Sequence, residues 1–143
     1  SAGTDTKRRR GRRKNGMREQ DRVTLSDSEW IIMQEIWKRG EATFREICDG
    51  VAADQWSKPA VAAFLKRMEK KGAIASAEGG PVKVYRSLLR RETAVRKETR
   101  DIFRRVYGGD VALLAQSLVR SAALDENDME ELIALLRKGR EEK

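Results

Sequence analysis

The chain has 143 residues, of which 39% are hydrophobic and 38% charged, and its formal net charge is +8. It contains no apolar run near the roughly 18 residues of a membrane span, so we expect one or two small domains with no membrane association. With no histidine and one cysteine, Cys48, it offers no zinc or copper site, no internal disulfide and no histidine-based catalysis, so we expect no cofactor and no enzymatic activity.

Most of the positive charge lies in the first 22 residues. Residues 1–22 carry nine Lys/Arg and three Asp/Glu, and the block KRRRGRRK within them includes Arg8, Arg9 and Arg10. Because this block has nothing apolar to bury, we expect residues 1–22 to form a disordered basic arm that is attracted to DNA, with a solubility tail as the alternative. The polar start also lacks the apolar stretch of a secretory signal, so we expect a cytoplasmic protein.

Two capping boxes mark the first two predicted helices. Ser26 followed by Glu29 precedes the helical apolar spacing of IIMQEIW, and Gly40 ends this helix. Thr43 followed by Glu46 opens a second, shorter helix. The inward face of the second helix carries Ile47, Cys48 and Val51, and the cysteine is interpreted as a small buried hydrophobe, with redox sensing as the alternative.

The stretch SKPAVAAFLKRMEKKG predicts a third helix that begins after the cap Ser57 and ends at Gly72. One face of this helix is apolar and carries Val61, Phe64, Leu65 and Met68. The candidates for DNA contact lie at its start and on the other face: Ser57, Lys58, Ala60, Ala62, Ala63, Lys66 and Arg67. Alanines allow close approach and contact thymine methyl groups, while the cations suit phosphates or guanine. We therefore predict a helix that reads the major groove, the alternative being a solvated basic face.

Trp56, directly before this helix, is expected to pack at the turn rather than to stack on a ligand.

A hairpin is predicted after the third helix. The short runs AIASAE and VKVYRS flank GGP, which indicates two strands and a turn between Ile74 and Ser87. Three helices followed by a hairpin predict a winged helix over residues 23–90. On its wing, Lys83 and Arg86 are candidates for contacts to the DNA backbone or minor groove, or are ordinary exposed strand residues.

Residues 91–143 return to helical spacing. Helices are predicted up to Gly108, after a cap at Asp110, and after Asp125. Their apolar stripes carry Val95, Ile102, Phe103, Val106, Leu114, Leu118, Met129, Leu132, Ile133 and Leu136. So small a unit can hardly cover these side chains by itself, so we expect a helical dimerisation domain over 91–143 and a homodimer.

Four segments in this order carry a family resemblance: LSDSEWIIMQEIW, WSKPAVAAFLKRMEKKGAI, VYRS and VYGGD. With them the chain resembles the BlaI/MecI/CopY family, the penicillinase and copper-transport repressors, from residue 25 to about residue 138. The resemblance implies a mainly α fold, in which a winged helix-turn-helix domain with a small β-hairpin wing precedes an all-helical dimerisation domain. It also implies a homodimeric transcriptional repressor that binds palindromic operators of resistance or stress-response genes.

The chain departs from this family at three places. Many members carry Thr, Arg and Thr where this chain has Ala60, Ala62 and Ala63, so the resemblance does not specify an operator sequence. The copper-responsive branch ends in a cysteine pair, which this chain lacks, so copper sensing is not implied. In the β-lactam branch an Asn–Phe bond is cut during induction, and the aligned pair here is Ser117–Leu118. A sensor protease, if one acts on this repressor, is expected to cut in the predicted helix over residues 110–121.

Two other functions fit the sequence pattern. A protein-interaction module could use the winged helix without specific DNA readout. A small-molecule sensor could hold an apolar ligand at the dimer seam, although no polar groups are placed for one.

Overall fold

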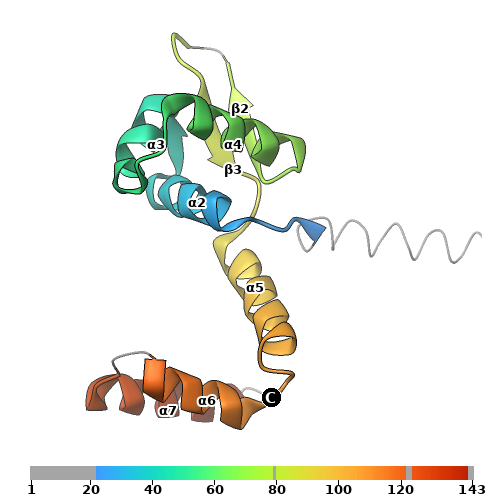
Figure 1. Cartoon of the computed structure of the whole chain (residues 1–143), viewed down its shortest axis with the longest axis vertical. Coiled ribbons are helices and arrows are strands. Elements are labelled where there is room, and N and C mark those ends of the chain that lie inside the picture. Colours follow the sequence, from blue (N-terminus) through green and yellow to red (C-terminus); the bar gives the residue numbers. More distant parts are fainter. Residues whose placement is uncertain (1–21, 79, 122–123, 142–143) are drawn as a thin grey trace, which may run out of the picture. The chain divides into compact units, whose positions relative to one another are not determined.

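The computed structural model describes residues 22–78, 80–121 and 124–141 (Figure 1). The chain consists of two compact units, one that ends at Lys97 and one that begins at Glu98. The predicted arm, with Arg8, Arg9 and Arg10, lies outside the described residues except for Arg22.

The first unit has the element order of a winged helix. Its elements are α2 (Asp27–Arg39), β1 (Glu41–Thr43), α3 (Phe44–Gly50), the 3-10 helix Ala52–Asp54, α4 (Lys58–Lys70), β2 (Ile74–Ala77), β3 (Val84–Ser87) and the start of α5 (Arg91–Arg105). Strand β3 lies between β1 and β2 and is antiparallel to both. Figure 1 shows β2 and β3 extending as a wing beside α4.

The predicted helix starts are confirmed by their caps. The side chains of Ser26 and Thr43 accept hydrogen bonds from the backbone N–H of Glu29 and Glu46, and each glutamate side chain accepts one in return. Ser57 Oγ accepts the backbone N–H of Ala60 at 3.2 Å and so caps α4. These bonds satisfy N–H groups that a helix start otherwise leaves unpaired, which fixes where α2, α3 and α4 begin.

The sheet has one strand more than the sequence pattern predicts. The hairpin between Ile74 and Ser87 is confirmed, but β1 pairs with the outer edge of β3, and Ala42 lies opposite Tyr85. Three residues are too few to show the alternation that identifies a strand, and Thr43 in β1 is also the cap of α3. Strand β1 therefore joins the wing to the connection between α2 and α3.

The core of the first unit fixes the orientation of α4. Of the apolar face predicted for this helix, Val61, Leu65 and Met68 are buried, whereas Phe64 is only half-buried. They pack with Leu25, Ile32, Met33, Ile36, Ala42, Ile47, Val51, Ala73, Ile74, Tyr85 and Leu89. Because one face of α4 belongs to this cluster, the opposite face is turned to solvent.

Two predicted core positions are less buried than expected. Cys48 is half-buried rather than enclosed. Phe64 is half-buried and packs against the half-buried Trp56 in an edge-to-face contact, with the ring centroids 5.1 Å apart. The prediction that Trp56 packs at the turn is therefore confirmed. Cys48 lines a hollow between α3 and the start of α4, and Phe64 lies beside the exposed Arg67, so each side chain borders the surface.

The second unit holds the rest of α5, α6 (Val111–Ser121) and α7 (Glu126–Glu141). The turn before α6 has positive φ at Gly108 and Gly109, and Asp110 Oδ1 accepts the backbone N–H of Leu113 at 3.1 Å. Each of these features lies where the sequence places a helix boundary. Among residues 98–121 and 124–139, no side chain is buried.

Candidate nucleic-acid interface

The outward face of α4 is open and basic. The exposed residues on it are Lys58, Ala62, Ala63, Lys66 and Arg67, while Ala60 is half-buried and the Ser57 hydroxyl serves as the cap. Cations therefore stand at the two ends of a stretch whose centre carries only methyl groups. With short side chains at its centre and long cationic side chains at its ends, such a helix can approach base edges closely and still reach phosphates on either side.

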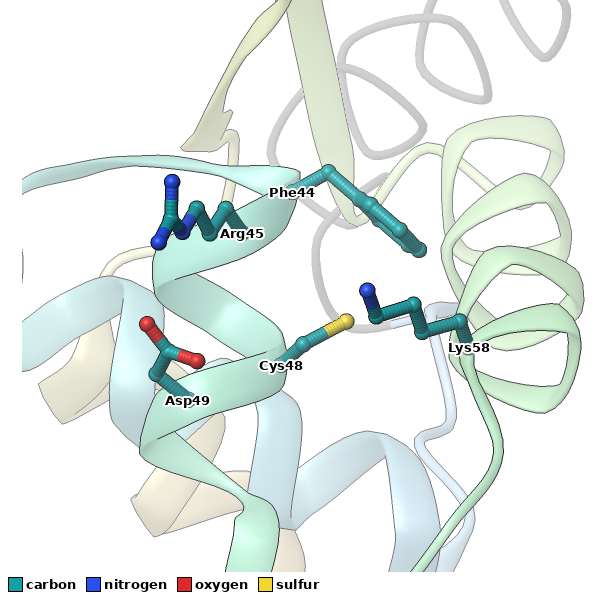
Figure 2. A pocket seen from close by; sticks show the side chains of 5 residues that line it. All are labelled: Phe44, Arg45, Cys48, Asp49 and Lys58. Atoms are coloured by element: carbon teal, nitrogen blue, oxygen red, sulfur yellow. The ribbon is translucent and has the colours of Figure 1, made fainter.

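A hollow of about 380 Å³ lies between α3 and the first turn of α4, lined by Phe44, Arg45, Cys48, Asp49 and Lys58. Figure 2 shows Lys58 reaching from α4 toward Cys48 and Phe44, whereas Arg45 and Asp49 extend away from it. Burial raises the pKa of the Cys48 thiol, Lys58 lowers it and Asp49 raises it, with a net increase, so the thiol is neutral at neutral pH.

Arg45 is a candidate contact that the sequence analysis misses. It is exposed in the first turn of α3, the helix that precedes α4 in the helix-turn-helix. In that motif the first helix crosses the DNA backbone, so a cation here is placed for a phosphate. The signal in the sequence is its position two residues after the cap Thr43.

A buried carboxylate lies beneath the other end of α4. The Glu29 side chain is 1% exposed, and its Oε1 accepts hydrogen bonds from Ser26 N at 2.8 Å and from Lys71 Nζ at 2.6 Å. Lys71 Nζ also donates to Thr24 O at 2.9 Å. Glu29 Oε2 lies 4.0 Å from Arg67 Nε. The sequence identifies Glu29 only as a capping residue, because its cationic partners lie far away along the chain.

The carboxylate of Glu29 is ionised at neutral pH. Burial raises its pKa, but the hydrogen bonds from Lys71 and Ser26 and the charge of Lys71 outweigh burial and bring the pKa below the ordinary value of 4.5. The end of α4 is therefore placed over a fixed negative charge.

Arg67 has a second neighbour on its own helix. Its guanidinium carbon lies 5.2 Å from the centroid of the Phe64 ring, on which Trp56 packs from another side. The side chain is nevertheless 60% exposed. The guanidinium of Arg67 thus has Glu29 and Phe64 as neighbours, while most of the side chain remains exposed to solvent.

The two candidates on the wing differ in their surroundings. Lys83 Nζ lies 3.7 Å from Glu69 Oε1 of α4 and 5.5 Å from the ring centroid of Tyr85. Arg86 is exposed and stands opposite Glu41 of β1 in the sheet register. The structure therefore brings Lys83 to α4, whereas Arg86 lies on the central strand β3, between Glu41 of β1 and Ala75 of β2.

The described residues include neither a candidate membrane span nor a candidate metal site. No helix among them is long and apolar enough to cross a membrane. No group of three or more His, Cys, Asp or Glu side chains that could hold a metal ion occurs in that part of the chain.

Comparison with known proteins gives consistent results. The family model described as penicillinase repressor matches residues 25–138. The penicillinase repressor of Bacillus licheniformis is 24% identical over 113 residues, which cover 78% of this chain and 88% of that protein. The penicillinase repressor of Staphylococcus aureus is 24% identical over 115 residues, which cover 80% of this chain and 91% of that protein.

Solved structures of transcriptional regulators are also similar. The ligand-free organohalide-sensing regulator RdhR-CbdbA1625 is 21% identical, with coverage of 98% of this chain and 77% of that chain and a TM-score of 0.46. The winged helix described above does not depend on this likeness. Because the family match spans most of the sequence and both relatives are repressors, the chain belongs to the penicillinase repressor family and is a transcriptional repressor.

Proposed function

We propose that this repressor binds double-stranded DNA as a homodimer, with α4 of each protomer in the major groove at one half of a palindromic operator. The observation that carries the proposal is the outward face of α4, which is fixed by the buried Val61, Leu65 and Met68 and has cations at both ends. Its relatives among the penicillinase repressors support resistance or stress-response genes as the targets.

The proposal gives the side chains different tasks. Lys66 and Arg67 contact phosphates or guanine, Lys58 contacts the backbone at the start of the helix, and Ala62 and Ala63 approach thymine methyl groups. Further proposed contacts come from Ser57, Ala60, Arg45, the wing residues Lys83 and Arg86, and the arm residues Arg8, Arg9 and Arg10. Hydrogen-bonding side chains are absent from the centre of this face, so we expect moderate sequence preference.

Residues 91–143 are proposed to form the dimer interface, with residues 23–90 as the DNA-binding domain. The stripe residues proposed for the interface are Val95, Ile102, Phe103, Val106, Leu114, Leu118, Leu132, Ile133 and Leu136. Other exposed apolar side chains of these helices are Val111, Leu113, Val119, Met129 and Leu135. Large exposed apolar side chains in such number are typical of an interaction surface, and a two-fold partner would cover the same surface on both protomers.

A sensor protease is a further proposed partner. The bond between Ser117 and Leu118 lies inside α6, where Ser117 Oγ donates to the Leu113 carbonyl at 2.8 Å. A protease needs extended chain, so cleavage here would require α6 to unfold locally. Mass spectrometry of the repressor after induction tests this: a cut within α6 supports the proposal, and an intact chain alongside derepression contradicts it.

Binding and sequencing of genomic fragments test the proposed function. Purified protein mixed with sheared genomic DNA should enrich fragments that share a two-fold symmetric site. Affinity for that site should fall steeply as the salt concentration rises, because Lys and Arg side chains displace counterions from the DNA phosphates and added salt opposes this release. A flat salt response, or no enrichment, would contradict the proposal.

A protein-interaction module is the second candidate, favoured by the absence of polar side chains at the centre of the outward face of α4. The same experiment separates the two, since such a module would enrich no fragment.

A further inference from the structure

The chain contains two capping-box glutamates in different surroundings. Glu46 at the start of α3 is partly exposed and lies 3.4 Å from Arg39 of α2. Glu29 at the start of α2 is buried and faces Lys71 and Arg67 of α4. A capping box by itself requires no burial of its carboxylate. The position of Glu29 beneath α4 therefore calls for a separate explanation.

We propose that Glu29 is a positioning residue for Arg67: it holds the guanidinium at the end of α4 so that its terminal nitrogens meet DNA. The proposal deepens the DNA-binding function and rests on it. The side chain of Glu29 is only 1% exposed and is not expected to touch DNA, yet it would affect DNA binding through Arg67.

The geometry of Arg67 supports this role. The contact with Glu29 Oε2 is made through Nε at 4.0 Å, and the ring of Phe64 lies 5.2 Å from the guanidinium carbon. Within the described part of the chain, no hydrogen bond of the terminal nitrogens Nη1 and Nη2 is found. A guanidinium that is attracted by a buried carboxylate on its Nε side and lies near an aromatic ring loses less rotational freedom when Nη1 and Nη2 bind a phosphate or guanine.

The second oxygen of Glu29 points to the same pair. Glu29 Oε1 is satisfied by Ser26 and Lys71, but the buried Oε2 has no hydrogen-bond partner among the described residues. A buried anionic oxygen without a partner is costly, so it favours conformations of Arg67 that keep the guanidinium near. Lys71 already uses donors on Glu29 and Thr24, which leaves Arg67 as the cation that can extend outward.

The test compares Glu29→Gln with Glu46→Gln. Each variant removes one capping-box charge and keeps the shape of the side chain, and loss of a negative charge by itself favours binding to a polyanion. We expect E46Q to bind duplex DNA as tightly as the parent or slightly more tightly. E29Q should instead bind about threefold to tenfold more weakly, which lies in the lower part of the range of coupling between residues in contact.

A double-mutant cycle with Arg67→Met ties the effect to its partner. In the R67M background, E29Q should bind no more weakly than E46Q. Two results would overturn the proposal. One is that E29Q binds DNA as tightly as E46Q when Arg67 is present. The other is that E29Q loses the same affinity with Arg67 present as in the R67M background. Failure of the parent to bind any duplex would instead contradict the proposed function.

A measurement on the free protein keeps the inference testable if E29Q does not fold. The Nε–H group of Arg67, whose resonance is assigned by its absence in R67M, should have a higher NMR order parameter than those of the exposed Arg45 and Arg86. An order parameter as low as those of these two arginines would overturn the positioning role whether or not DNA is bound.

Discussion

Three cations at the end of α4 have different surroundings and therefore different capacities. Lys66 is exposed, with no partner among the described residues. Arg67 is held near Glu29 and Phe64 but remains open, and Lys71 is committed to Glu29 and Thr24. Each of the three carries one positive charge, so their net charge alone does not distinguish them. Their contacts leave Lys66 and Arg67 open for the proposed DNA binding and give Lys71 a structural task.

Replacing Lys66 and Arg67 together with alanine should weaken DNA binding strongly. Each lost contact to a phosphate or guanine should cost about 1–3 kcal/mol, and the dependence of affinity on salt should become shallower. Fluorescence anisotropy with a labelled duplex at several salt concentrations measures both. Lys38→Ala/Lys138→Ala, which removes the same charge elsewhere, is the control, and equal binding by the two double variants would show that the assignment is wrong.

Acid should destabilise the first unit through Glu29. The pKa of Glu29 in the folded chain lies below 4.5, so the carboxylate stabilises the fold above that pH, and this contribution is lost as the pH falls further. Urea unfolding over a pH series should show a shallower acid decline for Glu29→Gln than for the parent. The hydrogen bonds from Thr43 also lower the pKa of Glu46, so E29Q should still lose some stability in acid through Glu46. The same decline in both proteins would contradict the role of Glu29.

At the scale of elements, α4 is positioned by its buried face and its cap. Val61, Leu65 and Met68 pack into the core, and Ser57 fixes the first turn. Side chains at these spacings return to one face of a helix, so burying them turns the intervening residues outward. The orientation of the face proposed to contact DNA is thus a consequence of core packing.

Replacing Leu65 with alanine should destabilise the first unit by about 2–5 kcal/mol, because a fully buried leucine loses both its burial and its packing partners. Ile31 of α2 is exposed and provides the matched control, since Ile31→Ala removes apolar volume from the surface. Thermal denaturation of both variants measures the difference. A similar loss of stability in the two would mean that α4 is not held by this core.

The sequence is sufficient to predict the features of α4 but not those of its surroundings. The cap at Ser57 and the helical spacing from Val61 to Met68 are local signals, so they predict the helix and its outward face. The contact of Glu29 with Lys71 joins residues far apart in sequence and leaves no local pattern. Strand β1 is missed for the same reason, because its pairing with β3 depends on the tertiary fold.

At the scale of the whole molecule, the two units differ in what they bury. All the core residues belong to the first unit, while α6 and α7 keep Val111, Val119, Leu135 and Leu136 well exposed. The first unit therefore has the core of an independent domain, whereas the second leaves apolar side chains exposed that the proposed partner protomer would cover. A palindromic operator also requires two recognition helices about 34 Å apart, which one chain does not provide.

A fragment that ends at Lys97 should fold as a monomer. This end is preferable to one at Arg90, because the start of α5 belongs to the first unit and Lys97 Nζ lies 3.5 Å from Thr24 Oγ1. The Trp30–Trp37 pair should keep a protected fluorescence spectrum. Binding to a two-site operator should weaken greatly, because the second half-site is no longer engaged at high effective concentration. A fragment that binds the operator as tightly as the parent would contradict the role of the C-terminal helices.

The C-terminal helices are proposed to join two copies of a DNA-binding winged helix. Sedimentation velocity of the full chain at micromolar concentration, with the fragment ending at Lys97 as the reference, measures this joining. We expect a dimer for the full chain, a monomer for the fragment, and a complex of two full chains with one operator duplex. A full chain that sediments as a monomer, alone and on DNA, would contradict it.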